Sequence, residues 1–208
     1  MDQPRGPLDR APFGAPEPRA EDARLLTGRG RYVTDVELPR MLHVAFVRSP
    51  HAHARVRALD AAPALALPGV SAVATGADRD FAPHRIQARS ALPGYVMTAQ
   101  PILAWPEARF AGEAVAAVVA RDRYAAEDAA ERVAVDWEPL PAALALRDPA
   151  RGGAIVHEAA PGNVLLARRF ESGQVEATLA AAAAVVERDF RTNRQTAAPL
   201  EGRAGVAD

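Results

Sequence analysis

The sequence predicts a mixed α+β fold, and three stretches carry this prediction. Residues 42–48 (LHVAFVR) alternate in side-chain character in the manner of a strand. Residues 114–120 (AVAAVVA) form a continuous apolar run, as expected for a strand covered on both faces. A helical segment and an alternating strand at residues 133–137 (VAVDW) follow that run. We therefore expect strands and helices to occur together.

The first sixty residues begin without regular structure and then form short elements. Residues 1–19 hold five prolines and two glycines without periodicity, and we expect a flexible leader. The segment AEDARLLTG that follows predicts a short helical turn ending at Gly28. We expect the strand at 42–48 to be well buried, because both of its faces are apolar. Residues 55–59 (RVRAL) predict a short strand with its arginines on one side.

The middle of the chain contains a capped helix, a strand and a long irregular stretch. Asp60 is predicted to cap a short alanine–leucine helix that residues 67–69 (LPG) end. The strand VSAVAT follows at residues 70–75. Residues 77–105 are the least regular part, and we expect a long loop of the kind that often forms an interface or binding segment.

The strongest structural signal is the strand–helix–strand unit around residues 114–137. Asp122 is predicted to be the N-cap of its helix. Asp128 and Arg132 are predicted to form an exposed i,i+4 pair worth about 0.3–0.5 kcal/mol. Further along, we expect a helix at 174–183 and a strand at 184–191. The helix after Asp122 is predicted to place four residues near one face: Tyr124, Ala125, Ala129 and Val133.

Charge and lysine content limit the classes of function. The net charge of −1 favours neither nucleic acid nor an anionic membrane as a partner. All 25 basic residues are arginine, so the lysine of a P-loop, a Schiff base or a pyridoxal enzyme is excluded.

The absence of cysteine excludes a second group of functions. A chain without cysteine forms no disulfide, binds no cysteine-ligated zinc or iron–sulfur cluster, and has no thiol nucleophile. The first 30 residues lack the apolar region of a signal peptide, and no apolar run approaches the roughly 20 residues that span a bilayer. We therefore expect a soluble, cytoplasmic chain.

Histidines and glycines offer only weak candidates for a binding site. The GxG in TGRGRYV (27–33) lacks a third glycine and precedes a strand, so a phosphate-binding loop is not favoured. His51 and His53 are two residues apart, and on a strand they would face the same way and could ligate a metal. A turn with hydrogen-bonded imidazoles is the favoured alternative. The other histidines are scattered: His43, His84 and His157.

Serines and carboxylates also fail to form a recognisable catalytic set. Glu113, at the head of the buried strand, is expected to hydrogen-bond backbone amides at a turn or to lie at an interface. The acidic residues at 126–131 are expected to form a solvated helix surface. We therefore predict no catalytic, cofactor-binding or metal-binding residue in this chain. The four serines lie outside any GxSxG motif: Ser49, Ser71, Ser90 and Ser172.

Five spaced segments nevertheless resemble one family. In chain order they are EDARLLTGRGRYVTDVELPRMLHVAFVRSPHAHARV, PGVSAVATGAD, FAGEAVAAVVARDRYAAEDAAERVAVDWEPLPA, AIVHEAAPGNVLL and VVERDFRTNRQTAAPLEGR. The chain resembles the N-terminal part of molybdenum hydroxylase large subunits. These are the molybdopterin-binding chains of the xanthine dehydrogenase, aldehyde oxidase and aerobic carbon monoxide dehydrogenase family.

The resemblance implies a domain order and an incomplete site. It implies a leader at 1–19, an α/β hammerhead domain at 20–142, a connector at 143–160, and the truncated start of a molybdopterin-binding domain at 161–208. The catalytic glutamate and the pterin-binding loops of the family would follow Asp208. The chain alone is then expected to bind no cofactor and to supply structural and interface surface.

The resemblance also implies a reaction, a cofactor and partners. The intact family enzyme is an oxidoreductase that inserts water-derived oxygen and passes electrons to partner subunits. It would carry molybdenum–molybdopterin, in the cytosine dinucleotide form. Its partners would be the remainder of the large subunit and iron–sulfur and FAD subunits, with no nucleic acid and no membrane. Two alternatives remain open: a stand-alone hammerhead interaction or assembly module, and an inactive truncated remnant.

One motif departs from the pattern of the family. Pro199, Glu201 and Arg203 match a motif that usually has the sequence PMEPRG. Gly202 and Ala204 depart from it, so the local turn is expected to differ. The match implies that Glu201 is structural rather than catalytic.

Overall fold

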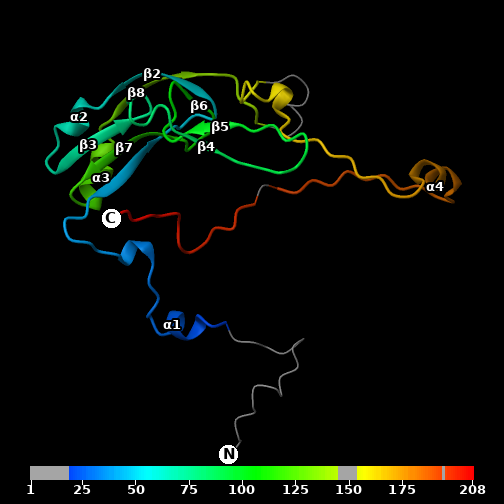
Figure 1. The fold of residues 1–208 in the computed structure, drawn as a ribbon, viewed down its shortest axis with the longest axis horizontal. Helices are drawn as coiled ribbons and strands as arrows, with labels where there is room; N and C mark the ends of the chain where they lie inside the picture. The colour runs from blue at the N-terminus through cyan, green and yellow to red at the C-terminus, as the bar shows by residue number, and fades with distance from the viewer. Residues whose placement is uncertain (1–18, 145–153, 194) are drawn as a thin grey trace, which may run out of the picture. The chain divides into compact units, whose positions relative to one another are not determined.

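The computed structural model describes residues 19–144, 154–193 and 195–208. Almost all of the expected leader lies outside the described residues. The chain divides into two compact units, one of residues 40–187 and one in which the segment up to Pro39 meets Arg188–Asp208. All strands of the described chain belong to the unit 40–187 (Figure 1).

The smaller unit contains the predicted N-terminal helical turn. Helix α1 spans Asp22–Leu26, and Gly28 follows with a φ of 70°, so the predicted end at this glycine is confirmed. A 3-10 helix, η1, spans Val33–Asp35. The Val33 amide donates to Glu201 Oε1 at 2.9 Å, which ties the two segments of this unit together.

The unit 40–187 is built around a three-stranded antiparallel sheet with the order β1–β7–β3. Strand β1 spans His43–Arg48, β3 spans Val70–Thr75 and β7 spans Ala114–Ala120. All three were predicted from their sequence patterns. The apolar run forms the central strand, which is the position that buries both faces.

A second antiparallel sheet has the order β6–β2–β8. Strand β6 spans Glu107–Ala108, β2 spans Ala54–Asp60 and β8 spans Ala134–Pro139. The predicted arrangement of the β2 arginines is confirmed, because Arg55 and Arg57 both pair with Glu138, at 3.2 and 3.0 Å.

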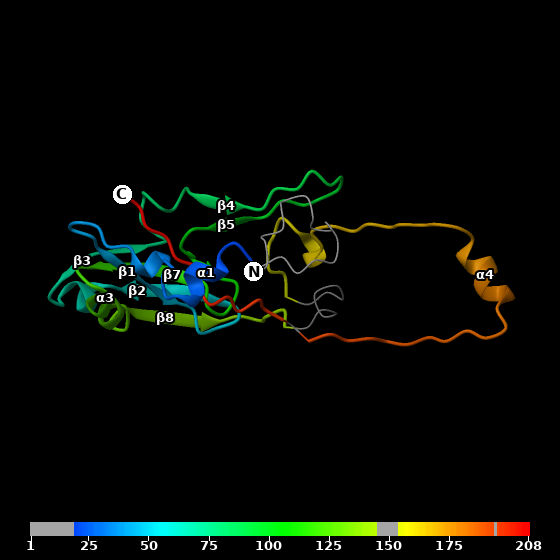
Figure 2. The same cartoon turned by 90° about the horizontal axis from the view of Figure 1, so that it is seen from below.

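Two short helices follow strands of these sheets, and both use an aspartate at their start. Helix α2 spans Ala62–Leu65, and the Ala62 amide donates to Asp60 Oδ1 at 2.9 Å. Helix α3 spans Arg123–Ala130 and lies against β1 and β7 (Figure 2). Asp122 is its N-cap and accepts from the Ala125 amide at 2.8 Å, as predicted.

The residues predicted to share one face of α3 differ in burial. Tyr124 is 79% exposed, whereas Ala126 and Ala129 are the buried residues of this helix. The short alanine side chains let the helix approach the sheet closely, and the larger tyrosine ring remains in solvent. The i,i+4 pair of the helix is Arg123–Glu127 at 2.8 Å, because the helix ends before Arg132.

Two apolar clusters form the core. The first joins the two sheets and consists of Val56, Ala104, Ala108 and Val115. The second joins β7 to α2, α3 and the residue that precedes β8, and it consists of Ala64, Val118, Ala129 and Val133. The central strand β7 contributes Val115 to the first cluster and Val118 to the second. It therefore packs on both of its faces and holds the unit together.

Strand β1 is less buried than its two apolar faces predict. Its exposure alternates, with Val44 53% and Phe46 48% exposed. The reason is that β1 is an edge strand, and α3 packs against the sheet from one side only. The Arg48 guanidinium lies 5.3 Å from the centre of the Phe46 ring and covers part of it.

The stretch 77–105 is more ordered than the predicted long loop. Strand β4 (Arg85–Gln87) pairs with β5 (Ala99–Pro101) as a two-stranded antiparallel sheet. Such short strands in a stretch of mixed polarity give no clear periodicity in the sequence.

The predicted strand at 184–191 is wrong. Helix α4 spans Val175–Ala181, and the described backbone after it is not a strand. Val186 and Phe190 are 79% and 91% exposed. A strand requires a hydrogen-bonded partner, and within the described residues this segment pairs with none.

Candidate functional site

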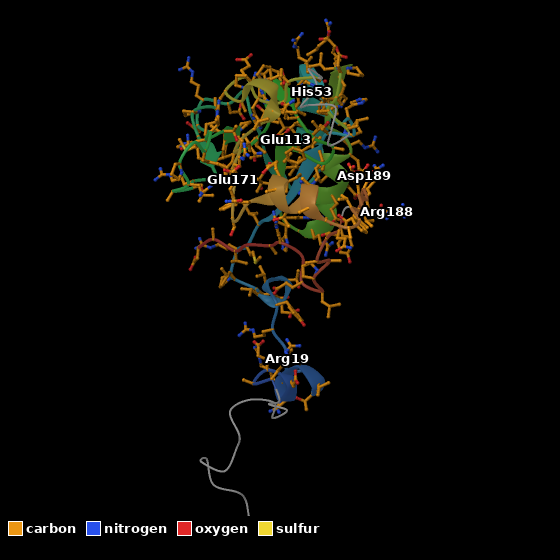
Figure 3. The ribbon with its side chains drawn as sticks, turned by 90° about the vertical axis from the view of Figure 1, so that its right-hand side faces the viewer. Arg19, His53, Glu113, Glu171, Arg188 and Asp189 are labelled. Carbon is orange, nitrogen blue, oxygen red and sulfur yellow. The ribbon has the colours of Figure 1, made fainter. Side chains whose placement is uncertain are left out.

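A group of charged side chains converges where β2, β6 and β7 begin or end. His53 precedes β2, Glu107 belongs to β6, Arg109 follows β6 and Glu113 precedes β7. His157, from a segment much later in the chain, faces the same charges. We call these five residues the polar cluster; Figure 3 labels His53 and Glu113.

His53 uses both nitrogens of its ring. Nδ1 lies 2.6 Å from the Pro141 carbonyl oxygen, and Nε2 lies 2.8 Å from Glu107 Oε1. Both partners are oxygen atoms of acceptor groups, so a hydrogen bond forms from whichever ring nitrogen carries a proton. The favoured interpretation of the HAH motif, a turn with hydrogen-bonded imidazoles, is confirmed for His53.

The neighbouring residues of the HAH turn are also used in the fold. The His51 ring contacts the Trp137 ring edge-on, with centroids 5.8 Å apart. The Ser49 hydroxyl donates to the His51 carbonyl at 3.0 Å and accepts from its amide at 3.1 Å. Two residues of this turn are thus held by local contacts, and Ser49 is 3% exposed.

Arg109 and Glu113 connect the cluster to two backbone segments. Glu113 is 7% exposed, and its Oε2 accepts from the Arg109 amide at 2.5 Å. This contact confirms the expectation that Glu113 bonds a backbone amide at a turn. The Arg109 guanidinium donates through Nε to the Val156 carbonyl at 2.9 Å, and its Nη2 lies 3.5 Å from Glu107 Oε1.

The segment that Arg109 holds, residues 154–165, folds back on itself around Asn163; we call it the strap. The Asn163 side chain accepts from the Val156 amide at 2.7 Å and donates to the Ala154 carbonyl at 2.8 Å. The 3-10 helix η3, Pro161–Asn163, makes the turn that brings the amide into place. Ala160 within the strap is 1% exposed.

The cluster sets the Arg109 guanidinium beside the Glu107 carboxylate and the Arg109 amide beside the Glu113 carboxylate. Burial lowers the pKa of His157 below its ordinary value, and the Arg109 guanidinium lowers it further. Glu113 and Glu107 raise this pKa, but their effects are smaller. A neutral His157 therefore suits the folded strap.

This pKa shift predicts an acid-sensitive strap. A histidine with a lowered folded-state pKa contributes stability above its unfolded pKa of about 6.5, and that contribution is lost as the pH falls through the folded value. We expect the free energy of unfolding to fall more steeply below pH 6.5 for the native chain than for His157→Gln. Urea unfolding at several pH values between 5 and 8 measures both slopes, and equal slopes would contradict the assignment.

The remaining candidates from the sequence do not join the cluster. Glu201 accepts from the Val33 amide in the smaller unit, where the bond is compatible with the predicted structural role. His84 is exposed. Among the described residues no three histidine, aspartate or glutamate side chains come together to hold a metal ion. No helix in the described ranges has the length and apolar character needed to cross a membrane.

Sequence reasoning missed Arg109 and Asn163. Their contacts with Val156 link residues 47 and 7 positions apart. The Arg109 contact leaves no periodic signal. The PGN turn at 161–163 is the one local signal that could have found the strap, since Gly162 and Asn163 both adopt the positive φ that this turn requires, 70° and 57°.

The architecture is that of the hammerhead domain of a molybdenum hydroxylase large subunit. Residues 27–141 match the family model described as the a/b hammerhead domain of aldehyde oxidase and xanthine dehydrogenase. Residues 156–208 match the molybdopterin cofactor-binding domain. The chain belongs to the aldehyde oxidase and xanthine dehydrogenase family.

Individual relatives agree with this assignment. Over its whole length the chain is 39% identical to the nicotine 6-hydroxylase large subunit of Paenarthrobacter nicotinovorans, and the match covers 26% of that subunit. It is 49% identical to the carbon monoxide dehydrogenase large chain of Afipia carboxidovorans, over 62% of this chain and 15% of that one. The chain thus spans about a quarter or less of the length of these relatives.

A solved structure supports the same fold. Quinoline 2-oxidoreductase from Pseudomonas putida 86 superposes with a TM-score of 0.71 at 45% identity, over 81% of this chain and 21% of that chain. The predicted fold class, an α/β hammerhead followed by the first elements of a molybdopterin-binding domain, is confirmed.

Proposed function

We propose that this chain acts as the N-terminal portion of the large subunit of a molybdenum-containing hydroxylase and supplies structural and interface surface rather than the active site. The intact enzyme would insert water-derived oxygen into its substrate and pass electrons to partner subunits. The observation that carries the proposal is the order of the two family matches in one chain, a hammerhead followed by the opening of a cofactor-binding domain.

The polar cluster does not fit a molybdenum centre. Glu107 pairs with His53 and Arg109, and Glu113 accepts from a backbone amide, so both carboxylates already have partners. Molybdenum–molybdopterin is the cofactor of the intact family enzymes. We propose that further sequence of the large subunit holds it, in the cytosine dinucleotide form. By resemblance to the family in sequence, we propose a hammerhead domain at 20–142, a connector at 143–160 and the start of the cofactor-binding domain at 161–208.

The partners of this chain are proposed from its relatives. One relative in Paenarthrobacter nicotinovorans is named subunit gamma of the 6-hydroxypseudooxynicotine dehydrogenase complex, 36% identical over 90% of this chain. We propose the remainder of the large subunit, with iron–sulfur and FAD subunits, as partners here. A cytoplasmic location stays a prediction from the sequence.

The half-exposed apolar side of β1 supports the interface part of the proposal. Val44 and Phe46 are directly cross-strand from Val119 and Ala117 of β7, which continue the same face with apolar side chains. Ala72 of β3 is the partner of Val119 on its other side. Paired residues in an antiparallel sheet share a face. This face has the composition of a surface that another part of the large subunit covers.

Co-purification from the native host tests the proposed function. A tagged chain is expected to recover polypeptide that matches the rest of the cofactor-binding domain, together with molybdenum measured by elemental analysis. The tagged chain produced alone is expected to contain none. Phe46→Asp is expected to reduce recovery, whereas Tyr124→Asp, on the exposed side of α3, leaves it unchanged.

Three outcomes would count against the proposal. Stoichiometric molybdenum in the chain alone would place the cofactor site within it. Recovery of a homo-oligomer without other family polypeptide would favour the stand-alone assembly module. Recovery of no partner at all would favour an inactive remnant.

A further inference from the structure

We infer that the strap, residues 154–165, is a structural part of the hammerhead unit and that the polar cluster is its docking surface. The match to the hammerhead domain ends at residue 141, and the match to the cofactor-binding domain begins at residue 156. By sequence, most of the strap therefore belongs to the cofactor-binding domain. The contacts place it with the hammerhead instead. This inference rests on those contacts and is independent of the proposed function.

Val156 is held from both sides of its backbone. Its carbonyl accepts from Arg109 Nε at 2.9 Å, and its amide donates to Asn163 Oδ1 at 2.7 Å. One bond comes from the hammerhead and the other from within the strap. Neither polar group of this residue therefore needs water in the docked position.

Arg109 is oriented before it reaches the strap. Its amide is fixed by Glu113, and its guanidinium contacts Glu107 twice, at 3.5 Å to Oε1 and at 3.4 Å to the backbone carbonyl. Glu107 is in turn held by His53. A pre-oriented guanidinium loses little conformational freedom when it binds the Val156 carbonyl.

The strap has a shape of its own that matches this donor. The Ala160 amide donates to the His157 carbonyl and the Asn163 amide to the Ala160 carbonyl, each at 2.9 Å. These bonds and the Asn163 side chain close a compact turn. Ala160 within this turn is 1% exposed.

A second attachment holds the far end of the strap. The Val96 amide, in the connection that leads into β5, donates to the Leu165 carbonyl at 2.8 Å. The strap is therefore fixed near both of its ends, by Arg109 and by Val96. A segment attached at two points is expected to open together with the elements that hold it.

Hydrogen–deuterium exchange on the full chain tests the inference. Peptides covering 154–165 are expected to be protected in the native chain. Arg109→Ala removes the donor on the hammerhead and should raise exchange of these peptides by about 10-fold to 100-fold, because it leaves the Val156 carbonyl without a charged donor. Peptides from β7 are expected to keep their protection.

A strap-side variant separates local opening from misfolding. Asn163→Gly keeps a residue that accepts a positive φ but removes the side-chain amide, so it should raise exchange of the strap to a similar degree. Arg123→Ala, an exposed arginine on α3, is the matched control and should change neither region. If Arg109→Ala also raises hydrogen exchange in β7, the result of Asn163→Gly distinguishes local opening from misfolding. The Asn163 side chain bonds only to residues of the strap.

The inference would be overturned by either of two results. One is a native strap that exchanges at the rate of an unstructured peptide while β7 is protected. The other is unchanged protection of the strap in Asn163→Gly.

Discussion

Replacing Gly76 with alanine is expected to lower the free energy of unfolding by about 3 kcal/mol. A Cβ at this position would lie 2.4 Å from the Leu103 carbonyl oxygen and 2.7 Å from Trp105 Cβ. The first of these is a backbone atom that no rotamer change can move away. Relief of the clash therefore requires a shift of the backbone on one side.

The position of Gly76 explains why the effect should spread. Gly76 directly follows β3, and Leu103 is a buried residue that follows β5. The contact between Gly76 and Leu103 therefore joins the two ends of the segment that contains β4 and β5. Displacing it would also disturb Ala104, a member of the core cluster between the two sheets.

Urea unfolding followed by circular dichroism measures this effect. Gly205→Ala is the control, because nothing lies within 4 Å of a Cβ at that position. It should change the free energy of unfolding by less than about 0.5 kcal/mol. A Gly76→Ala chain as stable as this control would show that the close approach is not maintained.

Val118→Asp is expected to abolish cooperative folding, at a cost of more than about 4 kcal/mol. Val118 is fully buried in the centre of β7 and packs with Ala64, Ala129 and Val133. A carboxylate in this position would have to leave water among apolar side chains that offer it no hydrogen bond. The cluster joins the sheet to both of its helices, so its loss should separate all of them.

The adjacent residue gives a matched control. Val119 belongs to the same strand but to the other face, where it is only partly buried beside the half-exposed Val44. Val119→Asp should cost less than about 1 kcal/mol in the chain alone. The cooperativity of the urea transition measures both variants. Equal losses would show that the two faces of β7 are equally buried.

Local patterns in the sequence were sufficient for most of the secondary structure of the hammerhead unit. The run at 114–120 and the N-cap Asp122 are each defined by neighbouring residues, and both were predicted. The buried face of α3 was predicted only in part, because Ala129 belongs to the predicted face but the other buried residue, Ala126, does not.

Features that depend on distant partners were not predictable in this way. The pattern at 184–191 is compatible with a strand, but a strand forms only where another one pairs with it. The polar cluster was anticipated in part, since hydrogen bonds were expected for His53 and Glu113. The role of Arg109 was missed, because its partner Val156 becomes visible only when the chain is folded.

The polar cluster also determines how the strap responds to ionic conditions. Salt screens charges that are separated by more than a Debye length, about 8 Å at physiological ionic strength. The cluster joins His53 and Glu107 at 2.8 Å and Arg109 and Glu107 at 3.5 Å, with side chains that are 25% exposed or less. Partly buried partners held this close together are screened much less than exposed ones. Added sodium chloride is therefore expected to change the hydrogen-exchange protection of the strap very little.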